Sequence, residues 1–332
     1  MRPLKLFWGS RTGEDLIGNF YGYRVHNETL RKYTEMRDDV ILVDHPDKSD
    51  ACLYITTPEV FNIKPNKPTF LFTMFEGTTI PKAYLENLVK ADYLFVPSNW
   101  VKNLFSKHFP VDKIFVVPHG VEKDFSYRVR NPYPKVFRYL WVGAANPRKG
   151  YQELIYIWSK LRLELLPSIE LYIKTTRVPN CEIQQNRNVI LDSRNLSREE
   201  LVELYHKAHC FVFPTRGEGF GLTLAEAMAT GLPCIATGWS GETEFFDEKV
   251  GYPLKYKLAP SPVKSWIHGD LGLTEVAFPD VEDIAKKMVD VKDNYKMALK
   301  KGVSASIRIR TQFTWEKSAE KLITPMRDIL GV

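Results

Sequence analysis

The sequence lacks a run of the roughly 18 apolar residues that a membrane-spanning helix needs. Its N-terminus, MRPLKLFWGS, enters a strand pattern directly and has no apolar core of a signal peptide. We therefore expect neither a signal peptide nor a membrane span. These absences predict a cytoplasmic protein, and leave peripheral contact with the inner face of a membrane as an alternative.

Cysteines are few and far apart. Cys52, Cys181, Cys210 and Cys234 form no Cys-X-X-Cys pair, so the spacing predicts neither a zinc site nor a disulfide framework. Cys210 and Cys234 lie in apolar runs, where a buried reduced thiol is typical.

The excess of positive charge is also small. A formal net charge of +6 over 332 residues is modest, and nucleic-acid-binding proteins concentrate far more Lys and Arg on one face. This balance argues against a nucleic-acid partner and fits an anionic small ligand or a membrane surface. Hydrophobic residues make up 44% of the chain and aromatic residues 13%, which is typical of a packed globular protein with room for two domains.

Short apolar runs alternate with helical patterns along the chain. The runs show little polar alternation, which is typical of strands buried on both faces of a parallel sheet. In the first part they are residues 4–8, 40–44, 51–56, 69–74, 93–98 and 114–120, with helical segments at 26–36 and 82–91. After a segment rich in Pro, Arg and Tyr at 127–137, the pattern restarts with runs at 139–143, 169–175, 189–192, 210–215 and 233–238.

This restart predicts two doubly wound α/β domains, at residues 1–128 and 134–312, joined by a linker at 127–137. A final helical segment at 314–330 contains Pro325, which we expect to break or kink the helix.

One motif carries most of the chemical information. The stretch EGFGLTLAEAMATGLP (218–233) follows an apolar strand and places Glu218 in a glycine turn and Glu226 in the helix that follows. A helix start next to glycines offers main-chain N–H groups to an anion. The two acids can accept hydrogen bonds from hydroxyls at either end of a ligand, and a nucleotide sugar has this order of hexose, diphosphate and ribose. Alternatively, Glu226 is a solvated helix residue and Glu218 is a first-turn acid that the helix dipole favours.

The flanking sequence resembles the Glu-X7-Glu signature of retaining GT-B glycosyltransferases, particularly glycosyltransferase family four. Segments 142–155 (VGAANPRKGYQELI), 91–105, 116–125 and 313–322 are similar to further landmarks of that family. The resemblance implies two Rossmann-like domains with an interdomain cleft, and a C-terminal helix (313–332) that returns to the first domain. It implies transfer of a sugar from a nucleotide-diphosphate sugar, with retention of configuration, to a hydroxyl of a carbohydrate, glycolipid or other acceptor.

The resemblance also assigns residues. Lys149 and Arg148 would bind the diphosphate, where fixed cations stabilise the charge that develops on the leaving group. The other donor-binding positions would be Glu218, Gly219, Phe220, Gly221, Leu222, Thr223 and Glu226. Many relatives carry a further basic residue where this chain has Ala144, so the cationic clamp departs from the family pattern.

In the first domain, the resemblance places Gly22 in an acceptor-side loop and Glu76 after the fourth strand, where many relatives carry a histidine. Glu76 can position an acceptor hydroxyl or bind a main-chain loop, and both roles stay open. His119 fits a turn residue near the linker better than a catalytic base.

No Asp-X-Asp motif, which metal-dependent transferases use, occurs in the chain. We therefore expect a metal-independent enzyme without a cofactor, whose catalytic residues are Glu218, Lys149 and Glu76. Two other classes remain: a non-catalytic nucleotide-sugar binder of the same fold, and a hydrolase that uses two carboxylates.

Overall fold

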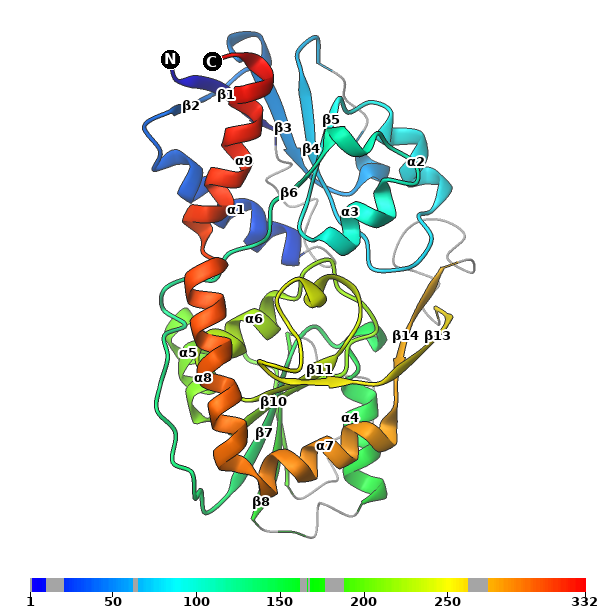
Figure 1. The fold of residues 1–332 in the computed structure, drawn as a ribbon, viewed down its shortest axis with the longest axis vertical. Helices are drawn as coiled ribbons and strands as arrows, with labels where there is room; N and C mark the ends of the chain where they lie inside the picture. The colour runs from blue at the N-terminus through cyan, green and yellow to red at the C-terminus, as the bar shows by residue number, and fades with distance from the viewer. Residues whose placement is uncertain are drawn as a thin grey trace. The chain divides into compact units, whose positions relative to one another are not determined.

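The computed structural model describes residues 2–9, 21–61, 65–161, 166, 168–176, 188–261 and 274–332. The chain forms two compact units. The first consists of Met1–Gly120, Lys264–Thr274 and Phe313–Val332, and the second of Val121–Val263 and Glu275–Gln312. Helices and strands of both units are labelled in Figure 1. No described helix combines the length and apolar character needed to cross a membrane.

The first unit is built on a six-stranded parallel sheet of order β2-β1-β3-β4-β5-β6. Every residue of β3 and β4 is buried, as expected for central strands covered on both faces. The strands are β1 (Leu4–Gly9), β2 (Val40–Val43), β3 (Ala51–Ile55), β4 (Thr69–Phe72), β5 (Tyr93–Val96) and β6 (Ile114–Val116). The six predicted runs therefore match the six strands within a few residues.

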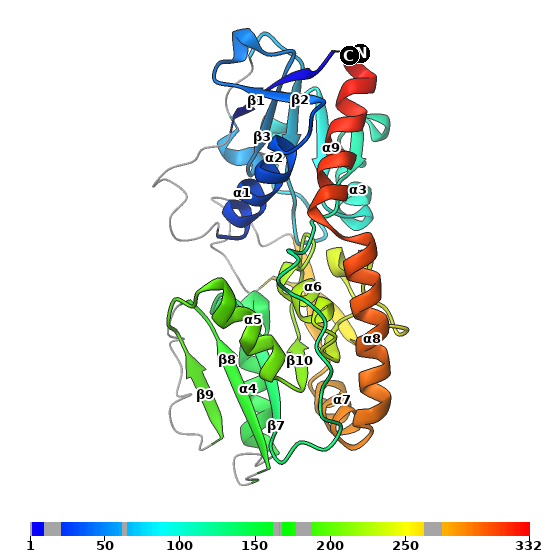
Figure 2. The ribbon, with the colours of Figure 1, turned by 90° about the vertical axis from the view of Figure 1, so that its left-hand side faces the viewer.

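Among its described residues, this unit has four α-helices: α1 (Tyr21–Glu35), α2 (Lys82–Leu88), α3 (Asn99–Phe105) and α9 (Trp315–Leu330). Short 3-10 turns cover Pro46–Lys48, Pro58–Val60 and Val111–Lys113. Helix α9 packs beside α1, as the two views show (Figures 1 and 2). It continues through Pro325, contrary to the predicted break. The buried residues Leu322, Ile323 and Met326 hold the helix on the unit. Pro325 has no N–H to donate to the carbonyl of Lys321, but Lys321 is exposed, so water can bond that carbonyl instead.

Two buried histidines join these elements. The ring of His26 in α1 stacks on that of His119, which follows β6, with centroids 4.0 Å apart. Both rings lie 6.0 Å from the ring of Trp315 at the start of α9. Burial lowers the pKa of His119 to about 3, and that of His26 well below its usual range. His119 is therefore part of the packed interior rather than a simple turn residue, and both rings are neutral at physiological pH.

The second unit repeats the architecture, with a six-stranded parallel sheet of order β12-β11-β10-β7-β8-β9. Its strands are β7 (Phe137–Val142), β8 (Ile169–Lys174), β9 (Val189–Asp192), β10 (Cys210–Phe213), β11 (Cys234–Thr237) and β12 (Tyr252–Leu254). An antiparallel pair follows, β13 (Tyr256–Pro260) with β14 (Glu275–Pro279). The sequence patterns predicted β7 to β11 but missed β12, β13 and β14.

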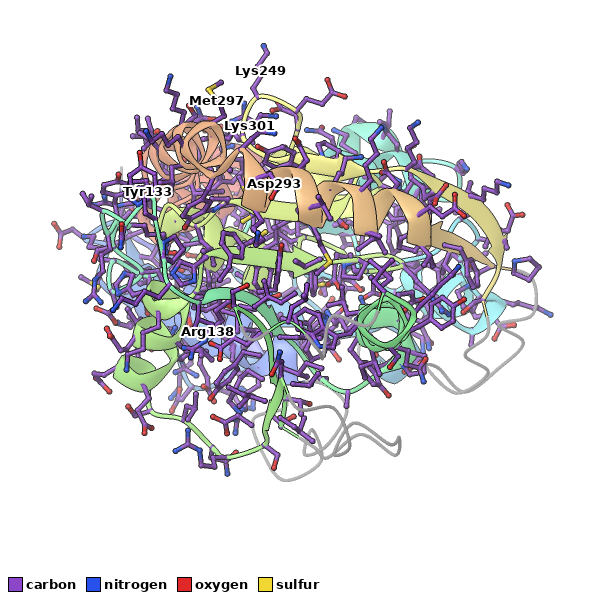
Figure 3. All side chains as sticks on the ribbon, turned by 90° about the horizontal axis from the view of Figure 1, so that it is seen from below. Tyr133, Arg138, Lys249, Asp293, Met297 and Lys301 are labelled. Carbon is purple, nitrogen blue, oxygen red and sulfur yellow. The ribbon has the colours of Figure 1, made fainter. Side chains whose placement is uncertain are left out.

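The helices of the second unit are α4 (Tyr151–Lys160), α5 (Arg198–Lys207), α6 (Leu222–Ala229), α7 (Val281–Asp293) and α8 (Tyr295–Gln312). Helix α8 packs against α6 and α7. At Gly302, α8 lies so close to Gly231, which follows α6, that only glycine fits: a Cβ on Gly302 would lie 2.3 Å from the carbonyl oxygen of Gly231. Lys301 of α8 lies beside the loop that carries Lys249 (Figure 3) and donates hydrogen bonds to the carbonyls of Glu248 and Gly251.

The boundary between the units differs from the predicted one. The sequence predicted a first domain ending at residue 128 and a linker at 127–137, whereas the compact units divide after Gly120. Phe125 packs edge-on against Tyr205 of α5. The buried guanidinium of Arg130 donates hydrogen bonds to the carbonyls of Tyr205, Ala208 and Thr230. These contacts place Phe125 and Arg130, which the sequence had assigned to the first domain and the linker, in the second unit.

Gly150 fixes the turn between β7 and α4. Its φ of 73° lies in the left-handed region, which favours glycine. A Cβ at this position would lie 1.9 Å from the carbonyl oxygen of Pro214, the residue directly after β10. Gly150 therefore lets the loops that follow β7 and β10 approach each other at the main chain.

The histidine stack predicts that the first unit loses stability in mild acid. Both histidines are neutral when folded but become protonated in the unfolded chain below its pKa of about 6.5, so stability is highest above that pH. It should fall by roughly 1.4 kcal/mol per pH unit for each histidine as the pH drops toward 3. Guanidinium unfolding of wild type and His26→Phe between about pH 7.5 and about pH 5 measures this slope. The variant should show a shallower slope, and exposed His45→Gln should match wild type; equal slopes in all three proteins would contradict the assignment.

The Gly150 turn predicts a large effect for a single methyl group. Gly150→Ala should lower the free energy of unfolding by roughly 2–4 kcal/mol, because it combines a left-handed alanine with a clash at the main chain. Gly22→Ala is the matched control: Gly22 lies in α1 with nothing within 4 Å of its Cβ direction, so alanine there should stabilise the helix by roughly 0.5–1 kcal/mol. Denaturant unfolding of the two variants would refute this account if their effects had the same sign.

Candidate functional site

Three loops of the second unit meet at one edge of its sheet. They follow β7, β10 and β11, which are neighbours in the sheet order. All three strands are parallel, so their carboxyl ends lie at the same edge. This is the edge at which open α/β sheets bind ligands.

The first loop presents the predicted basic pair. Residues Pro147–Lys149 form a 3-10 turn whose start is capped by Asn146, which accepts a hydrogen bond from the Arg148 N–H at 2.9 Å. The indole N–H of Trp141, in β7, donates to the carbonyl of Lys149 at 3.0 Å. The main chain that carries Arg148 and Lys149 is thus held at both ends by side chains.

The structure brings Arg148 and Lys149 together with Glu218. Glu218 is only 6% exposed, and its Oε1 lies 2.6 Å from Lys149 Nζ and 3.0 Å from Arg148 Nη1. The same oxygen accepts a hydrogen bond from Thr215 Oγ1 at 2.9 Å. Burial alone would raise the pKa of Glu218, but the charges of Arg148 and Lys149 outweigh it and hold the pKa below its usual value. The carboxyl group is therefore ionised.

The glycine turn and the helix start lie directly beside this cluster. Gly221 has a φ of 100° and caps α6, so Leu222 and Thr223 are the first residues of that helix. Gly219 and Phe220 are buried, and the Phe220 ring packs on Phe245 with centroids 4.8 Å apart. A Cβ on Gly221 would lie 3.9 Å from the Cβ of Glu218, so the helix begins next to the cluster. The first N–H groups of a helix have no partner within it, which suits an anion.

Glu226 occupies a separate environment farther along α6. Its Oε2 accepts a hydrogen bond of 3.0 Å from the hydroxyl of Tyr205, in α5, which also donates to the carbonyl of Thr223. Burial raises the pKa of Glu226 to about 7, against the opposing effect of Arg198. Glu226 therefore titrates close to neutral pH, whereas the two cations favour the ionised form of Glu218.

The predicted residues of the first unit lie on other elements. Glu76 follows β4 and is partly buried; burial raises the pKa of nearby Tyr23, and the charge of Glu76 raises it further. The Tyr23 hydroxyl accepts a hydrogen bond from the Met74 N–H at 3.1 Å. Gly22, predicted in an acceptor-side loop, is an exposed residue of helix α1.

Sequence reasoning missed Thr215, Ser240 and Glu242, which hold the cluster in place, and Tyr205, which bonds Glu226. Thr215 donates a hydrogen bond to the carboxylate of Glu218, and Ser240 accepts one from the Glu218 main-chain N–H. Ser240 and Glu242 lie in GLPCIATGWSGETEFF (231–246), part of the sequence that flanks the Glu-X7-Glu signature and resembles the same family, and this resemblance was the available signal. Cys181 lies outside the described residues, within which no three His, Cys, Asp or Glu side chains gather as metal ligands would.

Residues 137–291, which contain all three loops, match the family model described as glycosyl transferases group 1. Among curated proteins, the O-antigen chain mannosyltransferase of Salmonella typhimurium is 30% identical over 210 residues, covering 58% of this chain and 55% of that protein. The matched segments span about half or less of the first curated relatives.

Solved structures match over the whole chain. Sucrose-phosphate synthase from Thermosynechococcus elongatus superposes with a TM-score of 0.67 at 15% identity, covering 100% of both chains. Anabaena HepE, solved in complex with UDP and glucose, has a TM-score of 0.70 at 11% identity and covers 98% of this chain and 100% of that one. The chain therefore has the GT-B fold of these proteins, and its residues 137–291 match the glycosyl transferases group 1 family.

Proposed function

We propose that this protein transfers a hexose from a nucleotide-diphosphate sugar to an acceptor hydroxyl, with retention of anomeric configuration and without a metal ion. The observation that carries the proposal is the buried cluster of Glu218, Lys149 and Arg148 beside the start of α6. A diphosphate is an anion that two fixed cations and a set of helix-start amides can hold together. Matches to the group 1 family and to a structure solved with UDP and glucose support this ligand class.

Each group would then have one role. Lys149 and Arg148 would contact the diphosphate, Glu218 the transferred sugar, and Glu226 the ribose hydroxyls. Glu76 and Gly22, in the first unit, would lie on the acceptor side. The acceptor would be a carbohydrate, glycolipid or other hydroxyl compound.

The chemistry follows from the charges. As the bond between the anomeric carbon and the diphosphate oxygen breaks, negative charge grows on the leaving group, where Lys149 and the α6 amides stabilise it. The acceptor oxygen forms its bond to the anomeric carbon on the same face, and its proton passes to the departing diphosphate oxygen. In this substrate-assisted route, no side chain acts as the base.

Product analysis tests the proposal directly. Purified protein is incubated with UDP-, GDP- and ADP-sugars, with and without sugar acceptors, and thermal shift identifies the donor, since a ligand of the folded state raises its stability. We expect transfer that continues in EDTA, and a product whose anomeric proton coupling by NMR matches that of the donor. An inverted product would refute retention, and magnesium-dependent recovery after chelation would refute the metal-free site. Binding without turnover would favour the non-catalytic alternative.

The two glutamates predict opposite effects on nucleotide binding. Glu226→Ala should weaken binding of the free nucleoside diphosphate by roughly 1–3 kcal/mol, because ribose hydroxyls lose an acceptor. Glu218→Gln should leave that binding unchanged or stronger, since it removes the anion that occupies Lys149 and Arg148, and should lower turnover instead. Calorimetric titration measures both; equal affinities of the two variants would contradict these roles.

Because Glu226 titrates, the pH dependence of nucleoside diphosphate affinity provides a second test of its role in the same calorimetric experiment. In wild type, affinity for the nucleoside diphosphate should rise as the pH passes upward through about 7, because the ionised carboxylate is the better acceptor. Glu226→Gln, which has no such titration, should lose this part of the pH dependence. If it kept the wild-type profile, Glu226 would not contact the ribose.

Lys149 predicts an effect on chemistry. Lys149→Ala should lower turnover by roughly 2–4 kcal/mol of barrier, about 30- to 1,000-fold, with little change in acceptor affinity, because it removes one preorganised charge from the leaving group. Exposed Lys207→Ala of α5 is a control for the loss of one positive charge from the second unit. A proportional fall in activity for both variants would point to general electrostatics instead.

A further inference from the structure

The turn after β11 has an unusual main-chain conformation. Residues Ser240–Glu244 form a 3-10 turn that starts from Ser240, whose φ is 68°. Among the described residues Ser240 is the one non-glycine residue in the left-handed region. Such a conformation costs roughly 1–3 kcal/mol and persists only where surrounding contacts require it. The contacts of this turn therefore indicate what the strain achieves.

The strained turn holds the main chain of Glu218. Ser240 Oγ accepts a hydrogen bond from the Glu218 N–H at 2.8 Å, and the Gly241 N–H donates to the Glu218 carbonyl at 2.8 Å. A Cβ on Gly241 would lie 2.0 Å from the carbonyl oxygen of Gly219, so the two loops pack main chain on main chain. Both polar main-chain groups of Glu218 thus depend on the geometry of the 240–241 turn.

Glu242 completes this arrangement. Its side chain is 0% exposed, and its Oε2 accepts a hydrogen bond from Ser240 Oγ at 2.8 Å. Because the Ser240 oxygen accepts from Glu218 N–H, its single proton points to Glu242. Within the described residues, Oε1 of Glu242 has no hydrogen-bond partner. The three groups form a chain of hydrogen bonds from Glu218 through Ser240 to a fully buried carboxyl group.

The charges that face Glu242 favour its protonated form. Burial raises the pKa of Glu242 well above its usual value, and the charge of Glu218 raises it further, while Lys149 opposes both effects. Lys149 is already bonded to Glu218. An ionised Glu242 would be a second carboxylate that competes for the same cation.

We propose that Glu242 is a positioning residue that works as a neutral carboxylic acid: it orients the Ser240 hydroxyl and so fixes Glu218, and it leaves Lys149 and Arg148 to Glu218 and to the diphosphate of the donor. The part about the donor rests on the proposed function. The part about Glu218 and Ser240 does not, so the two can be tested separately.

The ligand-independent test is stability against pH in wild type and Glu242→Gln. An acid that stays protonated when folded but ionises at about 4.5 when unfolded lowers stability as the pH rises above 4.5, by about tenfold in the folding equilibrium constant per pH unit, until its own pKa is reached. Glutamine has no proton to lose. The stability of Glu242→Gln relative to wild type should therefore increase between about pH 4.5 and about pH 7. A constant difference would overturn the neutral state, whether or not the protein binds a sugar donor.

The second test uses the donor and its nucleoside diphosphate. Glu242→Gln keeps an acceptor for the Ser240 hydroxyl, so donor KM should stay within about twofold of wild type. Glu242→Leu and Ser240→Ala should each raise it by about tenfold, the scale of one lost buried hydrogen bond. The double variant should be no worse than either single variant, because both break one chain of bonds. Activity of Glu242→Gln should also extend to higher pH than that of wild type.

The outcomes distinguish the two proposals. If Glu242→Gln is as impaired as Glu242→Leu, or if the two losses add in the double variant, Glu242 does not act through Ser240. If the stability difference between wild type and Glu242→Gln changes with pH as expected, but wild type binds none of the nucleotide sugars, the positioning role stands and the proposed function fails. The donor KM of Glu242→Leu is informative only if this variant folds. Ser240→Ala breaks the same hydrogen bond and leaves the buried acid unchanged, so its donor KM tests the same point.

Discussion

The second unit is organised around one buried anion. Glu218 is ionised below the surface of the protein, and such a charge is costly unless cations and hydrogen-bond donors surround it. Lys149 and Arg148 supply the charge, Thr215 a hydroxyl, and the turn at Ser240 and Gly241 fixes the main chain. The local features of the three loops follow from this requirement: the Asn146 cap, the left-handed Gly150 and Gly221, and the absence of room for a side chain at Gly241.

The pairing of Glu218 with Lys149 and Arg148 gives the site one arrangement of charges without a ligand and another with an anionic ligand. Without an anionic ligand, the single charge of Glu218 is shared between two cations within hydrogen-bond distance, so the cluster keeps a net positive charge. A diphosphate would have to share those cations, so part of its binding energy would be used to rearrange an existing salt bridge. The arrangement keeps the basic pair ordered before the ligand arrives, which is how an enzyme site avoids reorganisation during the reaction. Glu226 lies outside this pairing, bonded to Tyr205, and is therefore able to respond to a different part of a ligand.

Sequence patterns predicted most of this arrangement, for identifiable reasons. Buried parallel strands show as short apolar runs, so β1 to β11 were visible, and the glycine turn with two acids showed the helix start at Gly221. Strand β12 has only three residues and β13 is largely exposed, so neither gives an apolar run. Arg130 lies in the segment predicted to be a linker, and only the fold shows that its guanidinium donates hydrogen bonds to buried carbonyls. The roles of Ser240 and Glu242 could not be predicted, because a left-handed serine and a neutral buried acid depend on contacts with residues 22 or more positions away.

The histidine stack of the first unit links parts of the chain that are synthesised far apart in time. His26 and His119 belong to the first 120 residues, but the tryptophan that completes their packing is residue 315. As a chain grows from its N-terminus at about 5–20 residues per second, the whole second unit emerges before helix α9 does. The first unit thus waits with an open apolar face for some ten seconds or more, on that scale, while its neighbour can fold. Ribosome-bound chains would be expected to meet chaperones at this face, and the N-terminal unit would be the later of the two to reach its final packing.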